Sequence, residues 1–183
     1  MSDLYTRFIA NLVFPLQERV KKHDTVRVRR QMEESQWWSA ERIAALQVER
    51  LKAFLTDIGA NVPYYRELFA STGFDPRAVK STADLQSLPF LTKAVIKDNT
   101  DALRADDAKG LARFNTGGSS GVPLIFFIGT ERVTHDVAAK WRATRWWDVD
   151  IGDPEVVVWG SPIELGTQDR MRLIRDKLMR TEL

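Results

Sequence analysis

Cysteine is absent from this sequence of 183 residues, and histidine occurs only twice. Without cysteine, the protein cannot form disulfides, use a catalytic thiolate or bind zinc through sulfur. The absence also fits a reducing compartment, and we expect a cytoplasmic protein. His23 and His135 are far apart in the sequence and have no partners at metal-ligand spacing, so we expect no metal site built from histidine.

Long apolar runs and an excess of one charge are also missing. Residues 8–16 form the longest N-terminal apolar run, but Asn11 interrupts it and no basic cluster precedes it, which argues against a signal peptide. No run is long enough to cross a bilayer. The 27 basic and 25 acidic residues nearly balance, and the one notable basic cluster, at residues 27–30, is typical of a solvated face. We therefore expect no nucleic-acid partner.

The composition is that of a globular domain, with 44% hydrophobic and 28% charged residues. An apolar residue recurs at every fourth position from 4 to 20, which predicts an amphipathic helix over residues 3–22. Its stripe contains Leu4, Phe8, Leu12, Leu16 and Val20, widened by Ile9 and Val13. Ser2 or Asp3 is suited to cap this helix, and Pro15 to bend it. We expect the helix to pack on its own domain rather than on a membrane or a partner.

Further helices are predicted from capping residues, which makes residues 1–110 a mainly helical region. Ser39 begins a helix that Gly59 ends, and shorter helices follow at residues 63–69, 81–88 and 93–99. Ser81 and Asp84 have the spacing of a capping box, and Thr92 is suited to cap the last of these helices. We expect a structural role for residues 64–66 (Tyr-Tyr-Arg). Residues 24–36 show no clear period, and residues 101–110 should be a surface connection.

A stretch rich in glycine and hydroxyls lies between two predicted strands, residues 111–115 and 124–128. Its sequence from 115 to 123 is Asn-Thr-Gly-Gly-Ser-Ser-Gly-Val-Pro. The glycines allow a tight bend with inward-facing backbone N–H groups, and the hydroxyls add neutral donors, which suits a phosphate chain. The stretch lacks the Gly-Lys-Ser/Thr of a P-loop and the Gly-x-Gly-x-x-Gly of a dinucleotide site. An ordinary glycine-rich hairpin is the alternative.

Residues 111–183 predict the start of a mixed sheet flanked by helices, so we expect an α/β fold. A helix over residues 130–147 should pack on the sheet through Val133, Val137 and Trp141. The apolar run at residues 156–159 predicts a strand covered on both faces, with a ligand crevice at its carboxyl end. Thr167 is suited to cap a last helix that reaches the end of the chain.

The stretch Thr-Gly-Gly-Ser-Ser-Gly-x-Pro resembles the phosphate-binding signature of the adenylate-forming superfamily. Other segments resemble, in the same order, its phenylacetate–CoA ligase-like branch, which includes capsule-polysaccharide-associated relatives. They are residues 62–66, residues 88–93, Gly152-Asp153 and Trp159-Gly160. Leu124 stands where many members of the superfamily have lysine. A residue other than lysine is common there in this branch, so the departure favours the branch and argues against a lysine–phosphate contact.

This resemblance implies an ATP-dependent ligase that uses Mg²⁺ to activate a small carboxylic acid, with coenzyme A as a candidate acceptor. The residues that it assigns to the ATP phosphates are Thr116, Gly117, Gly118, Ser119, Ser120 and Gly121. It places Trp159, Gly160 and Ser161 at the acyl pocket. Members of the family are longer, so we expect residues 1–110 and 111–183 to form part of one N-terminal AMP-binding domain. We expect this portion to be inactive without the rest of the protein.

The alternative to a ligase is that the chain is a non-catalytic domain. It would bind a partner or a membrane surface through the N-terminal amphipathic helix and the basic residues 27–30. Nucleic-acid binding, which would show a strong dependence on salt, ranks last.

Overall fold

The computed structural model describes residues 3–116, 123–156, 158 and 170–182. The chain divides into two compact units, described in turn below. The terminal unit contains residues 1–34 and 134–183, and the central unit contains residues 35–133. The described residues are mainly helical with two small sheets, which is consistent with an α/β fold.

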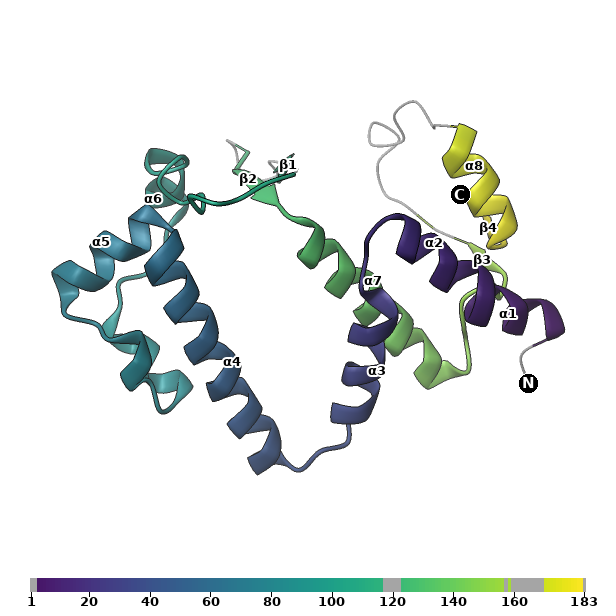
Figure 1. The fold of residues 1–183 in the computed structure, drawn as a ribbon, viewed down its shortest axis with the longest axis horizontal. Coiled ribbons are helices and arrows are strands. Elements are labelled where there is room, and N and C mark those ends of the chain that lie inside the picture. The colour runs from purple at the N-terminus through teal and green to yellow at the C-terminus, as the bar shows by residue number, and fades with distance from the viewer. Residues whose placement is uncertain (1–2, 117–122, 157, 159–169, 183) are drawn as a thin grey trace. The chain divides into compact units, whose positions relative to one another are not determined.

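The terminal unit begins with a helical rod that runs from Leu4 to Val20 (Figure 1). The rod consists of α1 (Leu4–Phe8), the π-helical turn η1 (Ile9–Val13) and α2 (Phe14–Val20). Asp3 caps it, because its carboxylate accepts a 2.7 Å hydrogen bond from the backbone N–H of Thr6. The π turn comes just before Pro15, whose ring would clash with the preceding turn of a regular α-helix.

The next helix, α3 (Thr25–Ser35), was not predicted because its inner face is largely polar. Thr25 and Arg29 are buried on this face together with Val28. The Thr25 hydroxyl donates to the buried carboxylate of Glu18, which the His23 ring also contacts at 3.3 Å. A polar buried face gives no apolar period, so periodicity could not reveal this helix.

An ionic cluster joins α3 to the 3₁₀ turn η4 (Arg145–Trp147) and the residues that follow it. The guanidinium of Arg145 binds both carboxylate oxygens of Asp150, at 3.0 and 2.7 Å, and one oxygen of Glu33 at 2.8 Å. Burial, and then the charge of Arg145, lower the pKa of the nearby Arg29 guanidinium. The hydrogen bonds to Asp150 and Glu33 instead raise the pKa of Arg145 and outweigh the effect of its burial.

The core of the terminal unit forms where α7 (Thr130–Thr144) contributes Trp141 and Ala138. Its buried apolar cluster contains Ile9, Ala10, Phe14, Trp141, Ile151 and Met179. The Trp141 ring meets the Phe14 ring edge-on at 6.5 Å. The expectation that this face of the helix packs on a sheet is therefore wrong for Trp141 and Val137, which pack with the N-terminal rod.

The last elements of the terminal unit also differ from the predicted ones. The strand β3 (Glu155–Val156) pairs in parallel with β4 (Thr181–Glu182), and α8 (Arg170–Leu178) lies between them in sequence. Val156 and Val158 are exposed, so the prediction of a strand covered on both faces is wrong for these residues. The predicted terminal helix ends at Leu178 rather than at the chain end.

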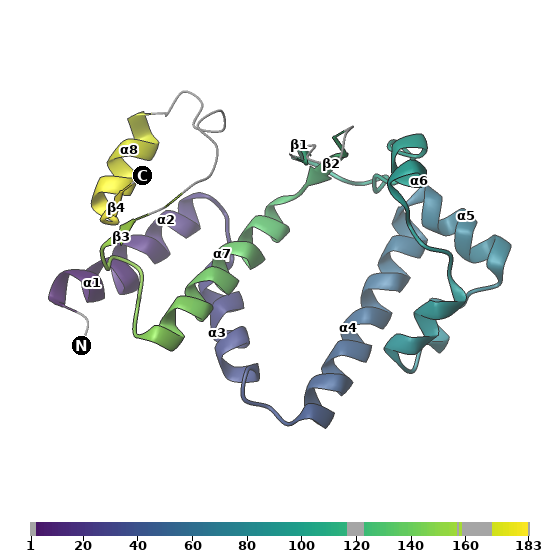
Figure 2. The ribbon, with the colours of Figure 1, turned by 180° about the vertical axis from the view of Figure 1, so that it is seen from behind.

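In the central unit, α5 (Pro63–Thr72) packs against the end of α4 (Ala40–Asn61), as Figure 2 shows. The predicted cap at Ser39 is confirmed, but α4 continues past Gly59, which does not end the helix. A Cβ on Gly59 would lie 2.9 Å from the Phe69 ring. The glycine thus allows close packing of Phe69, which belongs to a core of Leu55, Ile58, Val62, Phe69 and Val79.

Short capped elements complete the helical part of the central unit. They are the 3₁₀ turns η2 (Pro76–Ala78) and η3 (Thr82–Ser87) and the helix α6 (Lys93–Asp98). The predicted capping box of Ser81 and Asp84 is present, and the Thr92 side chain caps α6. Gly73 ends α5 in the left-handed conformation, with φ of 66°. Capping residues therefore located η3 and α6 correctly, whereas η2 was not predicted.

The predicted strand pair is confirmed as an antiparallel hairpin. The strand β1 (Ala112–Asn115) pairs with β2 (Ile125–Ile128), with Ala112 opposite Ile128 and Asn115 opposite Ile125. The rings of Phe114 and Phe126 stack across the pair, with centroids 6.3 Å apart. This hairpin carries the candidate phosphate loop.

Candidate functional site

The base of the candidate loop is closed by Thr116 and Leu124. The Thr116 N–H donates to the Leu124 carbonyl at 3.0 Å, and the Leu124 N–H donates to the Thr116 hydroxyl oxygen, also at 3.0 Å. These two bonds extend the hairpin by one step beyond Asn115 and Ile125. Thr116 and Leu124 therefore form the last paired position of the hairpin before the loop.

Thr116 is exposed at this point, and its bonds define what it can still offer a ligand. Its backbone N–H is already used in the hairpin, so it is not available for a phosphate. Its hydroxyl accepts one bond and retains its own proton to donate. The side chain of Thr116, rather than its backbone, is the group suited to contact an anion.

The other residues that sequence analysis assigned to the ATP phosphates lie outside the described part of the chain. They are Gly117, Gly118, Ser119, Ser120 and Gly121. Trp159, Gly160 and Ser161, assigned to the acyl pocket, also lie outside it. Their assignments therefore remain predictions.

Hydrogen bonds fasten the segment that precedes the hairpin to the α4–α5 corner. The N–H of Tyr64 donates to Ala102, and the N–H of Asp106 donates to Asn61. The guanidinium of Arg66 bridges this corner, because one nitrogen donates to the Ala60 carbonyl at 2.6 Å and to Asp106 at 2.8 Å. These contacts give Tyr64 and Arg66 the structural role that we expected.

Tyr65 also serves the packing of this corner. Its ring contacts Tyr64 at 5.3 Å and Phe69 at 5.8 Å between centroids. Burial, and to a smaller extent Tyr64, raise the pKa of the Tyr65 hydroxyl, so the group stays neutral at physiological pH. The segment at residues 62–66 thus supports the hairpin region and contributes no reactive group.

A hollow of about 300 Å³ opens beside the hairpin in the central unit. Its wall is mostly apolar, and its lining residues are Val62, Ile96, Thr100, Leu103, Arg104, Ala105, Ala108, Leu111, Ile125, Phe126 and Phe127. Ile125 follows directly after Leu124, so the hollow borders the base of the loop. An apolar hollow of this size suits a small organic ligand.

Arg104 supplies the one formal charge among the residues that line this hollow. Its guanidinium lies over the Phe127 ring, 4.6 Å from the centroid, and its ion pair with the exposed Asp101 is long, at 3.9 Å. A guanidinium that is held by an aromatic ring and weakly paired can still bind a carboxylate. The arrangement can therefore hold an apolar molecule that carries a negative group.

Neither Arg104 nor Phe127 was predicted to be a site residue. Arg104 lies in the polar segment 101–110, which resembles an ordinary connection, and Phe127 lies in a strand where an aromatic residue indicates packing. Their proximity depends on the path of residues 99–111 around the hairpin. The only sequence signal is a single arginine beside Leu103, which is too common to indicate a site.

The segment Gly152-Asp153, part of the resemblance described above, has a structural role in the terminal unit. Asp153 accepts a 2.7 Å hydrogen bond from the Thr6 hydroxyl and a 2.8 Å bond from the Asp150 N–H. Gly152 has φ of 96°, and a Cβ there would lie 2.8 Å from Cβ of Ile9. The pair therefore fastens the turn after η4 to the N-terminal rod.

Within the described ranges, no three carboxylate or imidazole side chains gather as metal ligands. Trp141 is buried in the terminal core, as expected of a packing residue, whereas Trp146 and Trp147 are exposed.

No protein-family profile matches this chain. Curated relatives do match about half of it. The phenylacetate–coenzyme A ligase of Aromatoleum evansii is 36% identical over 89 residues, and that of Thermus thermophilus is 33% identical over 87 residues. Protein CapK of Staphylococcus aureus is 26% identical over 93 residues. The matches cover 48%, 46% and 51% of this chain, respectively.

These matches cover 20% of the length of each of the three relatives. They agree with the resemblance found in the glycine-rich stretch and the segments around it. Over the half of the chain that they cover, this protein is phenylacetate–coenzyme A ligase-like.

Proposed function

We propose that this chain is part of an ATP-dependent ligase that activates a carboxylic acid and transfers it to coenzyme A. The observation that carries the proposal is the closed base of the hydroxyl- and glycine-rich loop, at Thr116 and Leu124. These two bonds fix the ends of the loop beside the exposed Thr116 hydroxyl, which can donate to a bound anion. The named relatives support the choice of reaction.

In the proposed reaction, the acid's carboxylate attacks the α-phosphate of ATP, and pyrophosphate leaves. The attacking group is already ionised at neutral pH, so no general base is needed. The contribution of the loop is to bind the β- and γ-phosphates through Gly117, Gly118, Ser119, Ser120, Gly121 and the Thr116 hydroxyl. Mg²⁺ bound to the phosphates would neutralise part of the charge on the leaving group.

The hollow beside the hairpin is the proposed site for the apolar part of the acid. It begins next to Leu124, and Arg104 lies on its wall, so the guanidinium can pair with the carboxylate of a bound acid. Phenylacetate is a suitable first acid to test, because two of the named relatives are ligases of this acid. The assignment of Trp159, Gly160 and Ser161 to the acyl pocket remains a prediction from the resemblance.

The function is tested first by titrating the 183-residue chain with MgATP and with Mg-pyrophosphate in a calorimeter. Both should bind, and Gly118→Val should weaken binding at least tenfold, because the added side chain blocks close approach of the backbone to phosphate. Gly129→Ala is the control, since a Cβ there would meet only Leu111 at 3.8 Å. Unchanged binding in Gly118→Val would remove the loop from the proposal.

The reaction itself is tested by ATP–pyrophosphate exchange with the complete product of the gene. Exchange should depend on phenylacetate or a related aromatic acid and should be lost in Gly118→Val. Circular dichroism and thermal melting establish that the variant is folded. A failure to detect exchange with any of the acids tested would contradict the proposed activity.

A further inference from the structure

The N-terminal rod has two apolar faces, and only one of them is buried. Ile9, Ala10 and Phe14 lie in the terminal core, with Tyr5 and Val13 packed against it. The predicted stripe at every fourth position is instead exposed, contrary to the expectation that it packs on its own domain. Its exposed fractions are 84% for Leu4, 51% for Phe8, 50% for Leu12, 52% for Leu16 and 85% for Val20. We call these five residues the outward stripe.

The π turn keeps the outward stripe on one side of the rod. In an α-helix, four residues exceed one turn of 3.6 residues, so a line drawn through every fourth residue winds steadily around the axis. A π-helix turns less per residue, so four residues make less than one full turn. Between Ile9 and Val13 the line therefore shifts around the axis in the opposite direction. The exposed apolar residues of the rod therefore follow a line that stays closer to the rod axis than it would in a regular α-helix.

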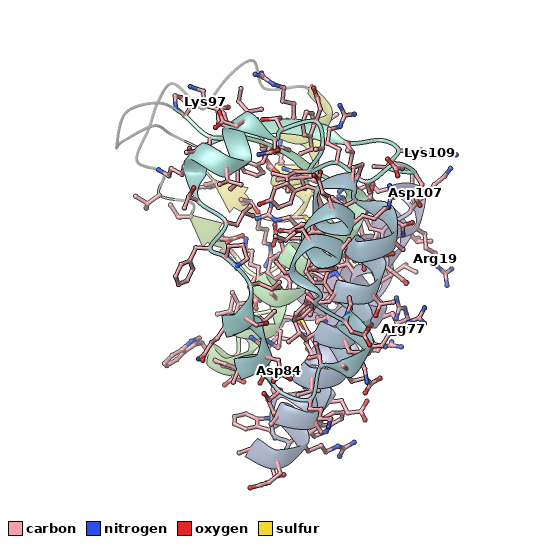
Figure 3. The ribbon with its side chains drawn as sticks, turned by 90° about the vertical axis from the view of Figure 1, so that its left-hand side faces the viewer. Arg19, Arg77, Asp84, Lys97, Asp107 and Lys109 are labelled. Carbon is pink, nitrogen blue, oxygen red and sulfur yellow. The ribbon has the colours of Figure 1, made fainter. Side chains whose placement is uncertain are left out.

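The charges on the rod leave a positive balance beside the outward stripe. Asp3 forms an ion pair with Arg180 at 2.8 Å, and Glu18 is buried against the Thr25 hydroxyl and His23. By contrast, the side chains of Arg7, Arg19 and Lys22 have no ion-pair partner in the described part of the chain. Arg19 extends away from the ribbon in Figure 3. The acidic groups are thus neutralised within the fold while the basic groups remain available.

We propose that the outward stripe docks on an anionic lipid surface. Exposed leucine and phenylalanine side chains would enter the boundary between headgroups and acyl chains, and Arg7, Arg19 and Lys22 would contact the negative headgroups. The rod would lie in the plane of the interface, since none of the described helices has the length and apolarity needed to cross a bilayer. This inference is independent of the ligase reaction.

Charge selects lipid as the occupant over a second copy of the chain. Two copies facing each other through the outward stripe would bring their unpaired Arg7, Arg19 and Lys22 side chains together, which is unfavourable. An anionic bilayer satisfies both the outward stripe and the basic groups beside it. Removing the N-terminal segment is not a suitable test, because Ile9 and Phe14 are core residues.

The test is flotation of the 183-residue chain with vesicles of equal parts phosphatidylserine and phosphatidylcholine. The chain should float with these vesicles, and added salt should release it. Replacing the two half-exposed residues in Leu12→Gln/Leu16→Gln should lower the partition coefficient roughly tenfold. Arg7→Gln/Arg19→Gln should lower it by a similar factor on anionic vesicles and have no effect on pure phosphatidylcholine.

A matched control lies in the central unit, where Phe54 and Phe90 are also exposed. Phe54→Gln/Phe90→Gln removes as much apolar surface without touching the rod, so flotation should not change. Circular dichroism establishes the helical content of each variant. Equal losses of vesicle binding in this control and in Leu12→Gln/Leu16→Gln would overturn the proposal.

Because the chain has no cysteine, a fluorophore can be attached at a single introduced cysteine. Its emission gives a second readout that reports insertion directly. A polarity-sensitive fluorophore attached in Leu12→Cys should shift to the blue on anionic vesicles, and the same fluorophore in Phe90→Cys should not. Absence of the shift at residue 12 would overturn the proposal. The proposal would also be overturned if the chain did not bind vesicles but formed a concentration-dependent dimer that Leu12→Gln/Leu16→Gln abolishes.

Discussion

Gly152 combines two constraints that no other residue type satisfies. Its φ of 96° lies in the region that glycine tolerates, and a Cβ would approach Ile9 Cβ at 2.8 Å and the Thr6 backbone at 3.2 Å. Both neighbours belong to a rigid helix with buried residues, so neither can move without disturbing the core. This glycine sets how closely the turn approaches the N-terminal rod.

Gly152→Ala should therefore destabilise the terminal unit by roughly 2–5 kcal/mol, through backbone strain together with overpacking. Gly73→Ala is the matched control, because Gly73 has φ of 66° but nothing lies within 4 Å of its Cβ position. The control should cost only about 1–2 kcal/mol from the left-handed conformation. Urea denaturation measures both, and equal costs would show that the contact with Ile9 is unimportant.

Asp3 is exposed, but its bonds stabilise its charged form. Hydrogen bonds from the Thr6 backbone N–H and then from Arg180 lower the pKa of Asp3 to about 2. The unfolded value is about 3.9, so the folded state favours the ionised form. The contribution of this charge to stability is complete above pH of about 4 and is lost as the pH falls towards about 2.

Asp3→Asn tests this effect, because asparagine also caps helices and only the charge is removed. The wild-type chain should be more stable than the variant above pH of about 4, and the difference should vanish as the pH falls towards about 2. Urea denaturation at several pH values measures it, and carboxyl NMR gives the Asp3 pKa directly. A difference that does not vary with pH would contradict the role of the charge.

At the scale of elements, capping residues were better guides than apolar periods. Ser39, Ser81 and Thr92 each begin the element that was predicted from them. Such caps act on the backbone within one turn, so their signal is local and does not depend on the rest of the fold. The two strands beside the glycine-rich stretch were predicted for the same reason, since short apolar segments next to glycines are a local signal, and the structure pairs them antiparallel.

Predictions failed where burial depends on distant parts of the chain. The apolar period of residues 4–20 correctly predicted a helix. The sequence does not show which of its two adjacent rows of apolar residues packs against Trp141. The buried face of α3 is polar because Glu18, on the N-terminal rod, accepts a hydrogen bond from Thr25. Gly59 continues its helix because Phe69 occupies the space beside it. In each case the deciding contact comes from another element.

The candidate site shows the same limit. The strands and the loop between them were predicted, but the hollow and Arg104 were not, because they arise where residues 99–111 pass the hairpin. The bonds of Thr116 modified the prediction for that residue, since its N–H closes the hairpin and leaves the hydroxyl as the available donor. Sequence thus indicates the chemistry of the loop, while the neighbouring pocket requires coordinates.

At the scale of the whole molecule, each compact unit has a hydrophobic core formed by its own residues. The core of the terminal unit brings residues near the two ends of the chain together, from Ile9 to Met179. The core of the central unit, from Leu55 to Val79, is built from residues much closer in sequence. A defect in one core therefore need not remove the contacts that form the other.

Phe69→Ala should separate the two cores experimentally. Phe69 is 6% exposed, and truncating a buried phenylalanine costs about 3–5 kcal/mol, partly because it leaves a cavity. Hydrogen exchange followed by mass spectrometry should show lost protection in α4 and α5, with protection of the N-terminal rod retained. Trp141→Ala should give the opposite pattern, because Trp141 packs on Phe14. Loss of protection in both regions with either variant would mean that the two cores unfold as one cooperative structure.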